Sequence, residues 1–261
     1  MFPFEDETSL SLLYHLNSEP WGNVEAYQRV TYEVEYKQVA PSSPPLSLPA
    51  PTESEVTRLA GSRSSCRAYE PKLLPLSILG SLLWGGYGIT RADTTLLHGS
   101  LALLRPVPSA GGLFPLEIYV ATQRVEGLAD GLHHYNVRHH ALEPLSAGPI
   151  FQALAPHLFM YQAIEHANAI VFLAAVFKRT QKKYGPRGYR YILLEAGHVA
   201  QNLCLLAVER ELGTLCMGGY SDGGLNEALG LSVLDEGVVY SIAIGWPAAA
   251  PVADSGSSAG G

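Results

Sequence analysis

Residues 108–122 are PSAGGLFPLEIYVAT, a run of small residues that leads directly into a strand-like segment. Most residues from position 116 to 122 are apolar, β-branched or aromatic, which predicts a strand. The preceding Pro108-Ser109-Ala110-Gly111-Gly112 has little side-chain bulk, so its backbone can approach a flat ligand and offer amide donors. An ordinary tight turn before the strand is the alternative interpretation.

Two further segments are expected to complete a core around this strand. Residues 169–177 form an almost continuous apolar run, typical of a strand buried on both faces. Residues 189–211 are the longest helix candidate, roughly 35 Å long if fully helical. Its apolar residues lie on most sides, as in a helix that is central or buried in a subunit interface.

The remaining segments predict an α+β fold, because helices and strands mix without a regular βαβ alternation. We expect a helix that starts near Thr52 with a capping box to Glu55, and a helix over residues 76–84 that Gly85 and Gly86 stop. The other expected elements are a helix at 225–229 and strands at 31–36, 131–135, 141–145, 214–217 and 238–244.

Composition divides the chain into three parts. Residues 1–52 form an N-terminal extension that ends in a proline- and serine-rich linker, PSSPPLSLPAPT at 41–52. Residues 53–247 hold the expected elements of one domain. Residues 248–261 are mainly alanine, glycine and serine and are expected to be disordered.

Charge and cysteine content exclude several classes of protein. The 261-residue chain has a formal net charge of -7, which argues against nucleic acid as a partner, since such proteins carry a basic patch. Its three cysteines form no Cys-x-x-Cys pair, so neither a zinc site nor a disulfide framework is expected. The N-terminus lacks a signal-peptide pattern, and residues 164–177 are too polar to span a bilayer. We expect a soluble, cytoplasmic protein.

A possible anion site comes early in the chain, at Arg63-Ser64-Ser65-Cys66-Arg67. Two guanidinium groups with a hydroxyl between them can hold a phosphate. The alternative is an exposed charged loop. No lysine or arginine follows Arg210, so a phosphate would need Arg63, Arg67 or the basic cluster near residue 183.

Two later motifs are candidates for chemistry. Lys183 and Tyr184 can act as an acid/base pair if their surroundings shift their pKa values. The alternative is a solvated loop that leads into the long helix. Gly218-Gly219-Tyr220 is either a second segment that lets a ligand approach the backbone or a flexible loop.

Histidines and a Glu-x-x-His motif raise the question of a metal. Glu195 and His198 resemble half of a di-iron site, but the second motif and two more glutamates are missing, so a polar stripe is expected. Four histidines at positions 133, 134, 139 and 140 flank a predicted hairpin turn and are interpreted as exposed polar residues. No metal site is predicted.

Taken in order, the motifs resemble the SagB-type, or azoline-oxidase, branch of the FMN-dependent nitroreductase superfamily. The series continues with Gly-Leu-His-His-Tyr-Asn at 131–136, Leu-Glu-Ala-Gly-His at 194–198, and Ile-Gly at 244–245. The resemblance covers residues 55–247. It implies a mixed central sheet wrapped by helices, an intertwined homodimer, and FMN at the dimer interface.

The resemblance also implies a role for each motif. The ribityl phosphate of FMN would be held by Arg63, Ser65 and Arg67. The catalytic signature of azoline oxidases would be Lys183-Tyr184. The flavin ring would lie along Pro108, Ser109, Ala110 and Gly111, with Gly218 and Gly219 on its other side.

One departure from the family concerns the phosphate site. Many nitroreductases place another arginine near the C-terminus, and this chain has none there. Arg187 or Arg190 would then have to supply the missing cation.

The reaction expected from the resemblance is a two-electron oxidation of a thiazoline- or oxazoline-like ring, or of a related C–N or C–C bond. The substrate would be a peptide or a carrier-bound intermediate, with Lys183 as the base, Tyr184 as its proton relay, and oxygen reoxidising the flavin. A cyclodehydratase or another biosynthetic enzyme is an expected partner. The alternatives are an NAD(P)H-dependent nitro- or quinone reductase and a non-catalytic scaffold subunit.

Overall fold

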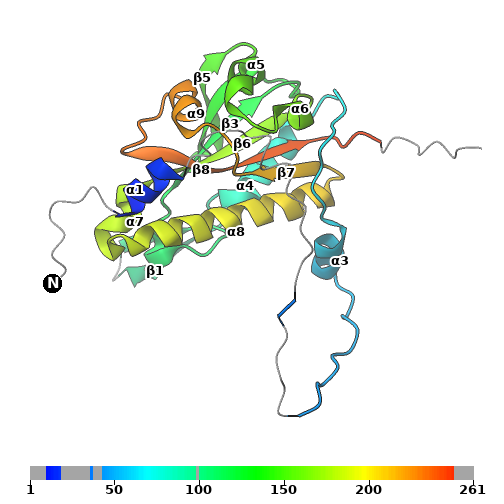
Figure 1. Ribbon diagram of the computed structural model, residues 1–261, viewed down its shortest axis with the longest axis vertical. Helices are drawn as coiled ribbons and strands as arrows, with labels where there is room; N and C mark the ends of the chain where they lie inside the picture. The colour runs from blue at the N-terminus through cyan, green and yellow to red at the C-terminus, as the bar shows by residue number, and fades with distance from the viewer. Residues whose placement is uncertain (1–9, 19–35, 38–42, 98–99, 250–261) are drawn as a thin grey trace, which may run out of the picture.

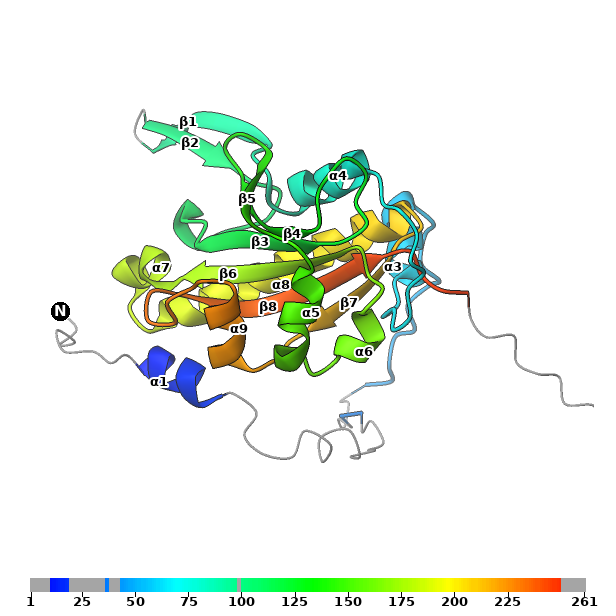
Figure 2. The ribbon, with the colours of Figure 1, turned by 90° about the horizontal axis from the view of Figure 1, so that it is seen from above.

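The protein is built around a six-stranded antiparallel sheet, seen in a computed structural model that describes residues 10–18, 36–37, 43–97 and 100–249 (Figure 1). The strand order is β5-β4-β3-β6-β8-β7. The six strands are β3 (Leu116–Thr122), β4 (Gly131–Asn136), β5 (Ala141–Ala147), β6 (Ala169–Val176), β7 (Gly213–Met217) and β8 (Glu236–Gly245). A separate hairpin of β1 (Arg91–Leu97) and β2 (Ser100–Leu104) stands away from this sheet (Figure 2).

Helices cover both faces of the sheet. The longest, α8 (Arg187–Glu209), crosses one face, and short helices lie on the other (Figures 1 and 2). The remaining helices are α1 (Leu10–Asn17), α3 (Glu55–Ser62), α4 (Leu76–Tyr87), α5 (Ile150–Leu154), α6 (Tyr161–Ile164), α7 (Phe177–Tyr184) and α9 (Asp222–Ala228). This arrangement confirms the predicted α+β fold.

Strand β6 lies in the interior of the sheet and is buried on both faces, as predicted. Val171 and Leu173 belong to the core cluster that contains α4 and α8. Ile170 and Phe172 belong to a second cluster, formed with residues of α5 and α9. Alternate residues of a strand point to opposite faces, so a strand between two cores must be apolar throughout.

Helix α8 has the length and apolar composition of a membrane span, but 44% of its most apolar window is buried inside the protein. Its residues Ile192, Ala196, Val199 and Leu203 pack in the same cluster as α4. The helix therefore fits the central position predicted for it.

The predicted end of the helix at 76–84 is wrong, because α4 continues through Gly85 and Gly86 to Tyr87. A Cβ atom on Gly86 would lie 2.7 Å from Leu203 Cδ2, and one on Gly85 would lie 2.6 Å from Leu206 Cδ1. The glycines thus do not stop α4 but let α8 approach it closely.

Several other boundaries differ from the predictions. The capping box of α3 joins Ser54 and Thr57 instead of Thr52 and Glu55. Helices α1 and α7 and the β1–β2 hairpin were not predicted. All residues of the predicted strand at 31–36 except Tyr36, which is not in a strand, and all but two residues of the predicted tail lie outside the described residues. Residues 43–52 of the linker form neither helix nor strand.

The N-terminal extension is in contact with the main domain through α1. His15 is buried, and its Nδ1 lies 3.0 Å from the hydroxyl of Tyr189 on α8. Burial lowers the pKa of His15, which fits a neutral ring in this contact. The side chain of Gln181 on α7 donates a hydrogen bond to Ser11 at 2.7 Å. Helix α1 therefore packs where α7 meets α8.

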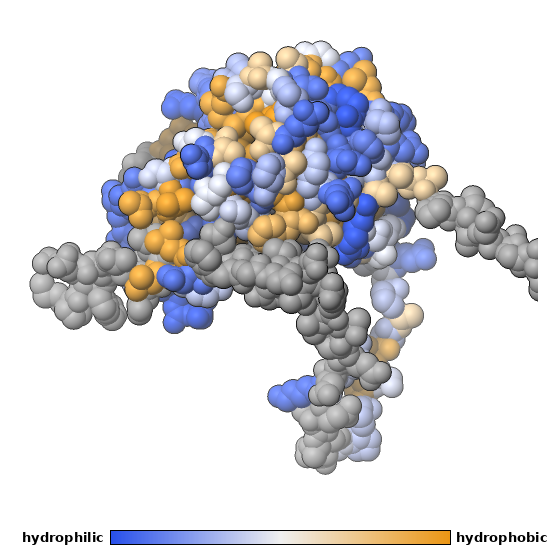
Figure 3. All heavy atoms as spheres, turned by 45° about the horizontal axis from the view of Figure 1, so that its top comes forward, coloured by the Kyte–Doolittle hydropathy of each residue, from blue (hydrophilic) through white to orange (hydrophobic). Residues whose placement is uncertain are grey.

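The view in Figure 3 brings the top of Figure 1 forward and shows the surface on the side of the short helices. Hydrophilic side chains are mixed with hydrophobic ones, which occur in separate small groups. Among the residues coloured in this view, the hydrophobic side chains do not merge into one large surface.

Replacing Gly86 by Val is expected to lower the free energy of unfolding by about 1–3 kcal/mol, the usual cost of overpacking a core. The matched control is Gly80→Val in the same helix, where an added Cβ would lie 3.7 Å from its nearest neighbour, His140 Nε2. Both changes replace glycine by valine in α4, so they change helix propensity equally. The difference between their free energies of unfolding, measured by urea denaturation, is therefore the cost of the clash with Leu203. Equal stability of the two variants would contradict the close packing of α4 on α8.

Candidate functional site

The antiparallel pairing of β3 with β6 brings two of the predicted motifs to one edge of the sheet. Leu116 at the start of β3 pairs with Ala175 near the end of β6. The small-residue loop at 108–112 precedes β3, and α7 follows β6. The loop and Lys183-Tyr184 must therefore lie at the same edge.

Lys183 and Tyr184 reach over Gly111 at this edge. A Cβ atom on Gly111 would lie 2.8 Å from Lys183 Nζ and 2.8 Å from Tyr184 Oη. Gly111 has a φ of +64°, a conformation that glycine adopts without steric cost. Only glycine fits here for both reasons, and the two side chains share one small region of space.

A buried carboxylate, Glu195 of α8, holds the loop in place. The hydroxyl of Tyr87 donates to Glu195 Oε1 at 2.6 Å and accepts from the backbone N–H of Leu116 at 3.2 Å. The Ser109 hydroxyl also lies close enough to lower the pKa of Glu195 through a hydrogen bond. Burial has the larger, opposite effect, so the pKa of Glu195 is raised. Ser109 Oγ in turn accepts from the N–H of Phe114 at 2.9 Å.

The interpretation of Glu195 and His198 as a polar stripe is wrong. Glu195 is 2% exposed, whereas His198 is exposed, so the two side chains face different surroundings. An isolated carboxylate in an apolar helix was the one signal in the sequence that could have indicated this anchoring role.

The prediction that the histidines around the hairpin turn are exposed is wrong for His133 and His134 and holds for His139 and His140. His133 is buried, with its Nδ1 3.4 Å from Thr122 Oγ1. His134 lies between Glu117 and Glu143, at 2.9 and 3.1 Å, and His140 contacts the Tyr135 hydroxyl at 2.8 Å.

The predicted phosphate motif lies beside the edge strand β7. Ser65 pairs with Thr214 in an isolated parallel bridge, and the N–H of Cys66 donates to the Thr214 carbonyl at 2.8 Å. Ser65 and Arg67 are exposed, and Arg63 is half-buried. Two guanidinium groups and a hydroxyl are thus open to a ligand, which fits the chemistry of a phosphate.

Two cysteines meet underneath this motif. The Sγ atoms of Cys204 on α8 and Cys216 on β7 lie 3.6 Å apart. The hydrogen bond from the Cys216 thiol lowers the pKa of Cys204 against the opposing effect of burial, with smaller contributions from Thr214 and Arg63. The scattered positions of these cysteines in the sequence gave no sign of the contact.

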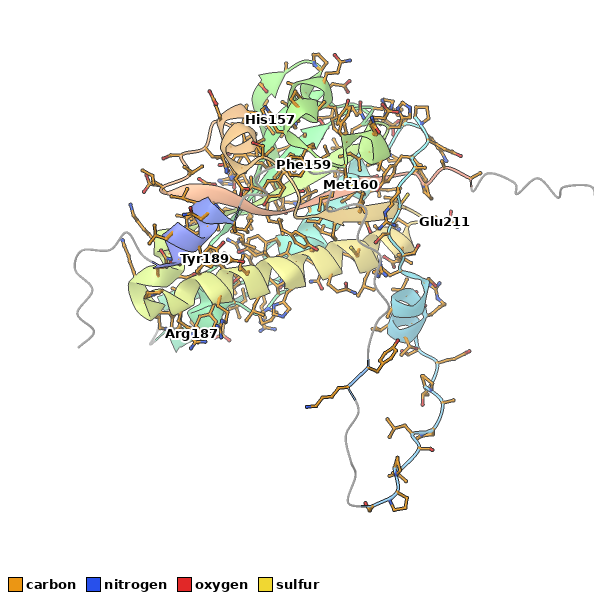
Figure 4. The ribbon with its side chains drawn as sticks, in the orientation of Figure 1. His157, Phe159, Met160, Arg187, Tyr189 and Glu211 are labelled. Atoms are coloured by element: carbon orange, nitrogen blue, oxygen red, sulfur yellow. The ribbon has the colours of Figure 1, made fainter. Side chains whose placement is uncertain are left out.

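The third predicted motif, Gly218-Gly219, follows the end of β7. The Gly219 carbonyl accepts from the N–H of Phe159 at 3.4 Å (Figure 4). A Cβ atom on Gly218 would meet nothing within 4 Å among the described residues. The backbone at Gly218 is therefore open to the approach of a ligand.

The structure places the predicted site residues along α8 in two groups. Arg187 begins α8 directly after Lys183 and Tyr184 of α7, whereas α3 lies beside the C-terminal part of α8 (Figures 1 and 4) and Arg63 lies near Cys204. Arg187 and Cys204 are 17 residues apart, which is about 25 Å along the helix. Each group fits one part of FMN, and the loop that carries Gly111 lies between them, because its Ser109 is beside Glu195. Arg187 and Arg63 can share a phosphate only if they come from different chains.

Replacing Glu195 by Gln is expected to change how stability depends on pH. Because the pKa of Glu195 is raised in the folded protein, the free energy of unfolding falls as the pH rises from about 4.5 through the folded-state value. The variant lacks this loss. As the pH rises, its free energy of unfolding should therefore increase relative to that of the wild type, by about 1.4 kcal/mol for each unit by which folding raises the pKa of Glu195. Urea denaturation at pH 5 and pH 8 measures the effect. Glu227→Gln, an exposed change on α9, should run parallel to the wild type, and a parallel Glu195→Gln curve would refute the assignment.

Comparison with known proteins places the chain in a family. The model of the nitroreductase family matches residues 60–246. The protein MJ1384 of Methanocaldococcus jannaschii, which is named as a nitroreductase, is 33% identical over 184 residues, 70% of this chain and 88% of that protein.

Two processing proteins are also similar in sequence. The trifolitoxin-processing protein TfxB of Rhizobium leguminosarum bv. trifolii is 29% identical over 66% of this chain and 48% of its own length. The microcin B17-processing protein McbC of Escherichia coli is 29% identical over 49% of this chain and 48% of its own length. The chain thus spans about half of each, and both similarities agree with the SagB-type resemblance.

Solved structures share the fold. A chain of the E. coli microcin synthetase McbBCD complex, with truncated pro-MccB17 bound, has a TM-score of 0.65 at 18% identity and matches 91% of this chain and 92% of that one. A Desulfovibrio desulfuricans protein in complex with FMN has a TM-score of 0.53 at 18% identity, over 76% and 89%. The chain therefore belongs to the nitroreductase family of FMN-dependent oxidoreductases.

Proposed function

We propose that this protein is an FMN-dependent oxidase that acts on an azoline-like ring, or on a related C–N or C–C bond, in a peptide or carrier-bound intermediate. The observation that carries the proposal is the meeting of Lys183 and Tyr184 over Gly111. The sequence similarity to two processing proteins supports the same class of substrate.

Turning a single bond of such a ring into a double bond removes two hydrogens, one of them as a proton. FMN, when bound, would supply the acceptor for the two electrons, and oxygen would be the final oxidant. The chain itself must supply a base, and the Lys183 amine is the group placed for it. Tyr184 Oη lies within reach of the same point as Lys183 Nζ, so the phenol can pass the proton on.

A lysine acts as a base only when it is neutral, which requires a lowered pKa. In the single chain Lys183 is exposed, so the described residues leave it open to water. Substrate, cofactor and a second protein chain over this edge would provide the burial that favours the neutral amine.

A homodimer would also solve the separation of the two groups of site residues. With two-fold symmetry, the Arg63–Arg67 end of one chain can face the Lys183–Gly111 end of its partner. Each FMN would then be held by two chains. A partner enzyme, such as a cyclodehydratase that makes the ring, is part of the proposal.

Replacing Lys183 by Ala is expected to lower the rate of azoline oxidation at least about 100-fold, the usual contribution of a general base, while FMN stays bound. The matched control is Lys182→Ala on the same helix, which should keep the wild-type rate. Turnover of a synthetic thiazoline peptide and the visible spectrum of the flavin are measured on the same samples. A Lys183→Ala enzyme with full rate would refute the role of this residue.

The same samples test the reductase alternative, which the similarity to MJ1384 favours. Under the oxidase proposal NADPH leaves the flavin spectrum unchanged for minutes, whereas the thiazoline bleaches it when oxygen is absent. Rapid bleaching by NADPH, with no bleaching by the thiazoline, would replace the proposal by a nitro- or quinone reductase.

Mixed dimers test whether each site is shared between chains. Arg63→Ala/Arg67→Ala and Lys183→Ala are each expected to be inactive. A purified heterodimer of the two should recover about half of the wild-type rate, since symmetry gives it one site with both defects and one intact site. If each site lay within one chain, both sites of the heterodimer would carry a defect and no activity would return.

A further inference from the structure

A cavity lies beside Gly111 on the side of the β1–β2 hairpin. It has a volume of about 770 Å³ and is bounded by β2, the loop before β3, and α7. Its apolar walls include Leu103 and Val107. Figure 2 shows the hairpin standing at this edge of the sheet.

The charges around this cavity are all positive. Arg91, Arg105 and Arg179 line it, and no aspartate or glutamate does so among the described residues. The cavity therefore differs in sign of charge from the chain as a whole, whose formal net charge is -7. Arg179 is already paired with Glu117 and donates to the Phe114 carbonyl at 3.3 Å.

Arg105 has no such partner. Its guanidinium lies over the rings of Tyr87 and Phe114, 4.0 and 4.8 Å from their centroids. Its Nη1 atom is buried and makes no hydrogen bond within the described part of the chain. A ring face stabilises the charge but accepts no directed hydrogen bond comparable to that of an oxygen.

The buried carboxylate of Glu195 does not fill this role. Glu195 is close enough for Arg105 to affect its pKa, but no ion pair within 4.0 Å joins the two side chains. Glu195 already receives the Tyr87 hydroxyl. A buried donor without an acceptor is costly, and the half-buried Arg105 also lines the cavity, so its guanidinium suits an acceptor that enters there.

We propose that this cavity binds the carboxylate of the substrate, with Arg105 as its anchor. The planar fork of a guanidinium matches the two oxygens of a carboxylate, and the apolar walls suit an uncharged body. Because the cavity shares Gly111 with Lys183 and Tyr184, a ligand held by Arg105 has its other end beside the base.

The carboxylate site rests on the proposed function, and it restricts the class of substrate. The oxidised ring belongs to a molecule with a free carboxylate close to it, such as the C-terminal residue of a peptide or a released acid. A ring in the interior of a peptide, or one joined to a carrier as a thioester, has no carboxylate at that position.

The test is binding of benzoate and of its neutral isostere benzamide to the FMN-loaded protein, measured by titration calorimetry. Benzoate is expected to bind the wild type at least about ten times more tightly than benzamide, as a charge-assisted hydrogen bond predicts. Arg105→Gln should remove this preference. Arg138→Gln, an exposed change of the same charge in the β4–β5 turn, should keep it.

Arg105→Lys is a second variant in case Arg105→Gln does not fold. It keeps the positive charge without the planar guanidinium and should bind benzoate with intermediate affinity. Equal binding of the two probes by the wild type, or no binding, overturns the proposal. An Arg105→Gln protein that still prefers benzoate also overturns it. An Arg105→Gln protein that loses FMN overturns it as well, because the cofactor would then be the acceptor for Arg105.

These outcomes are separate from the fate of the proposed oxidase activity. If benzoate binding depends on Arg105 and thiazolines are not oxidised, the carboxylate site stands and the reaction must be another one. If thiazolines are oxidised and benzoate does not bind, the oxidase stands and the carboxylate site is wrong.

Discussion

One buried carboxylate joins the parts of the molecule on which the candidate site depends. Glu195 belongs to α8, Tyr87 to α4, and Ser109 to the loop before β3, and their side chains meet in the interior. The core around them is apolar, so their hydrogen bonds have no competition from water. The loop that carries Gly111 is therefore fixed by the same helix against which α4 packs.

The length of α8 has a second effect on the architecture. The helix separates Arg187, at its N-terminus, from Cys204 and the neighbouring Arg63 by about 25 Å. The homodimer proposed above would bring these ends of two chains together, and it would also cover Lys183, which is exposed in one chain. In this view the distance between the two groups is what makes dimerisation part of the proposed mechanism.

Much of the fold could be predicted from the sequence, since β3 and β6 carry clear patterns and α8 is long and apolar. The helix break at Gly85-Gly86 was predicted wrongly, because a glycine that ends a helix and one that admits a neighbouring helix look alike without the partner. The contact of Lys183 with Gly111 depends on the register of β3 and β6, which local patterns do not specify. Arg105 and the Cys204–Cys216 contact likewise arise only from tertiary packing.

The left-handed backbone at Gly111 also limits how this site can evolve. Every missense change there adds a Cβ atom close to Lys183 Nζ and Tyr184 Oη in a backbone conformation that favours glycine, so substitutions in that wall of the site are strained. The opposite wall belongs to the β1–β2 hairpin, which stands apart from the sheet (Figure 2) and contributes little to the hydrophobic core. New substrate preferences would accordingly be acquired by mutation of the hairpin, with the catalytic wall left intact.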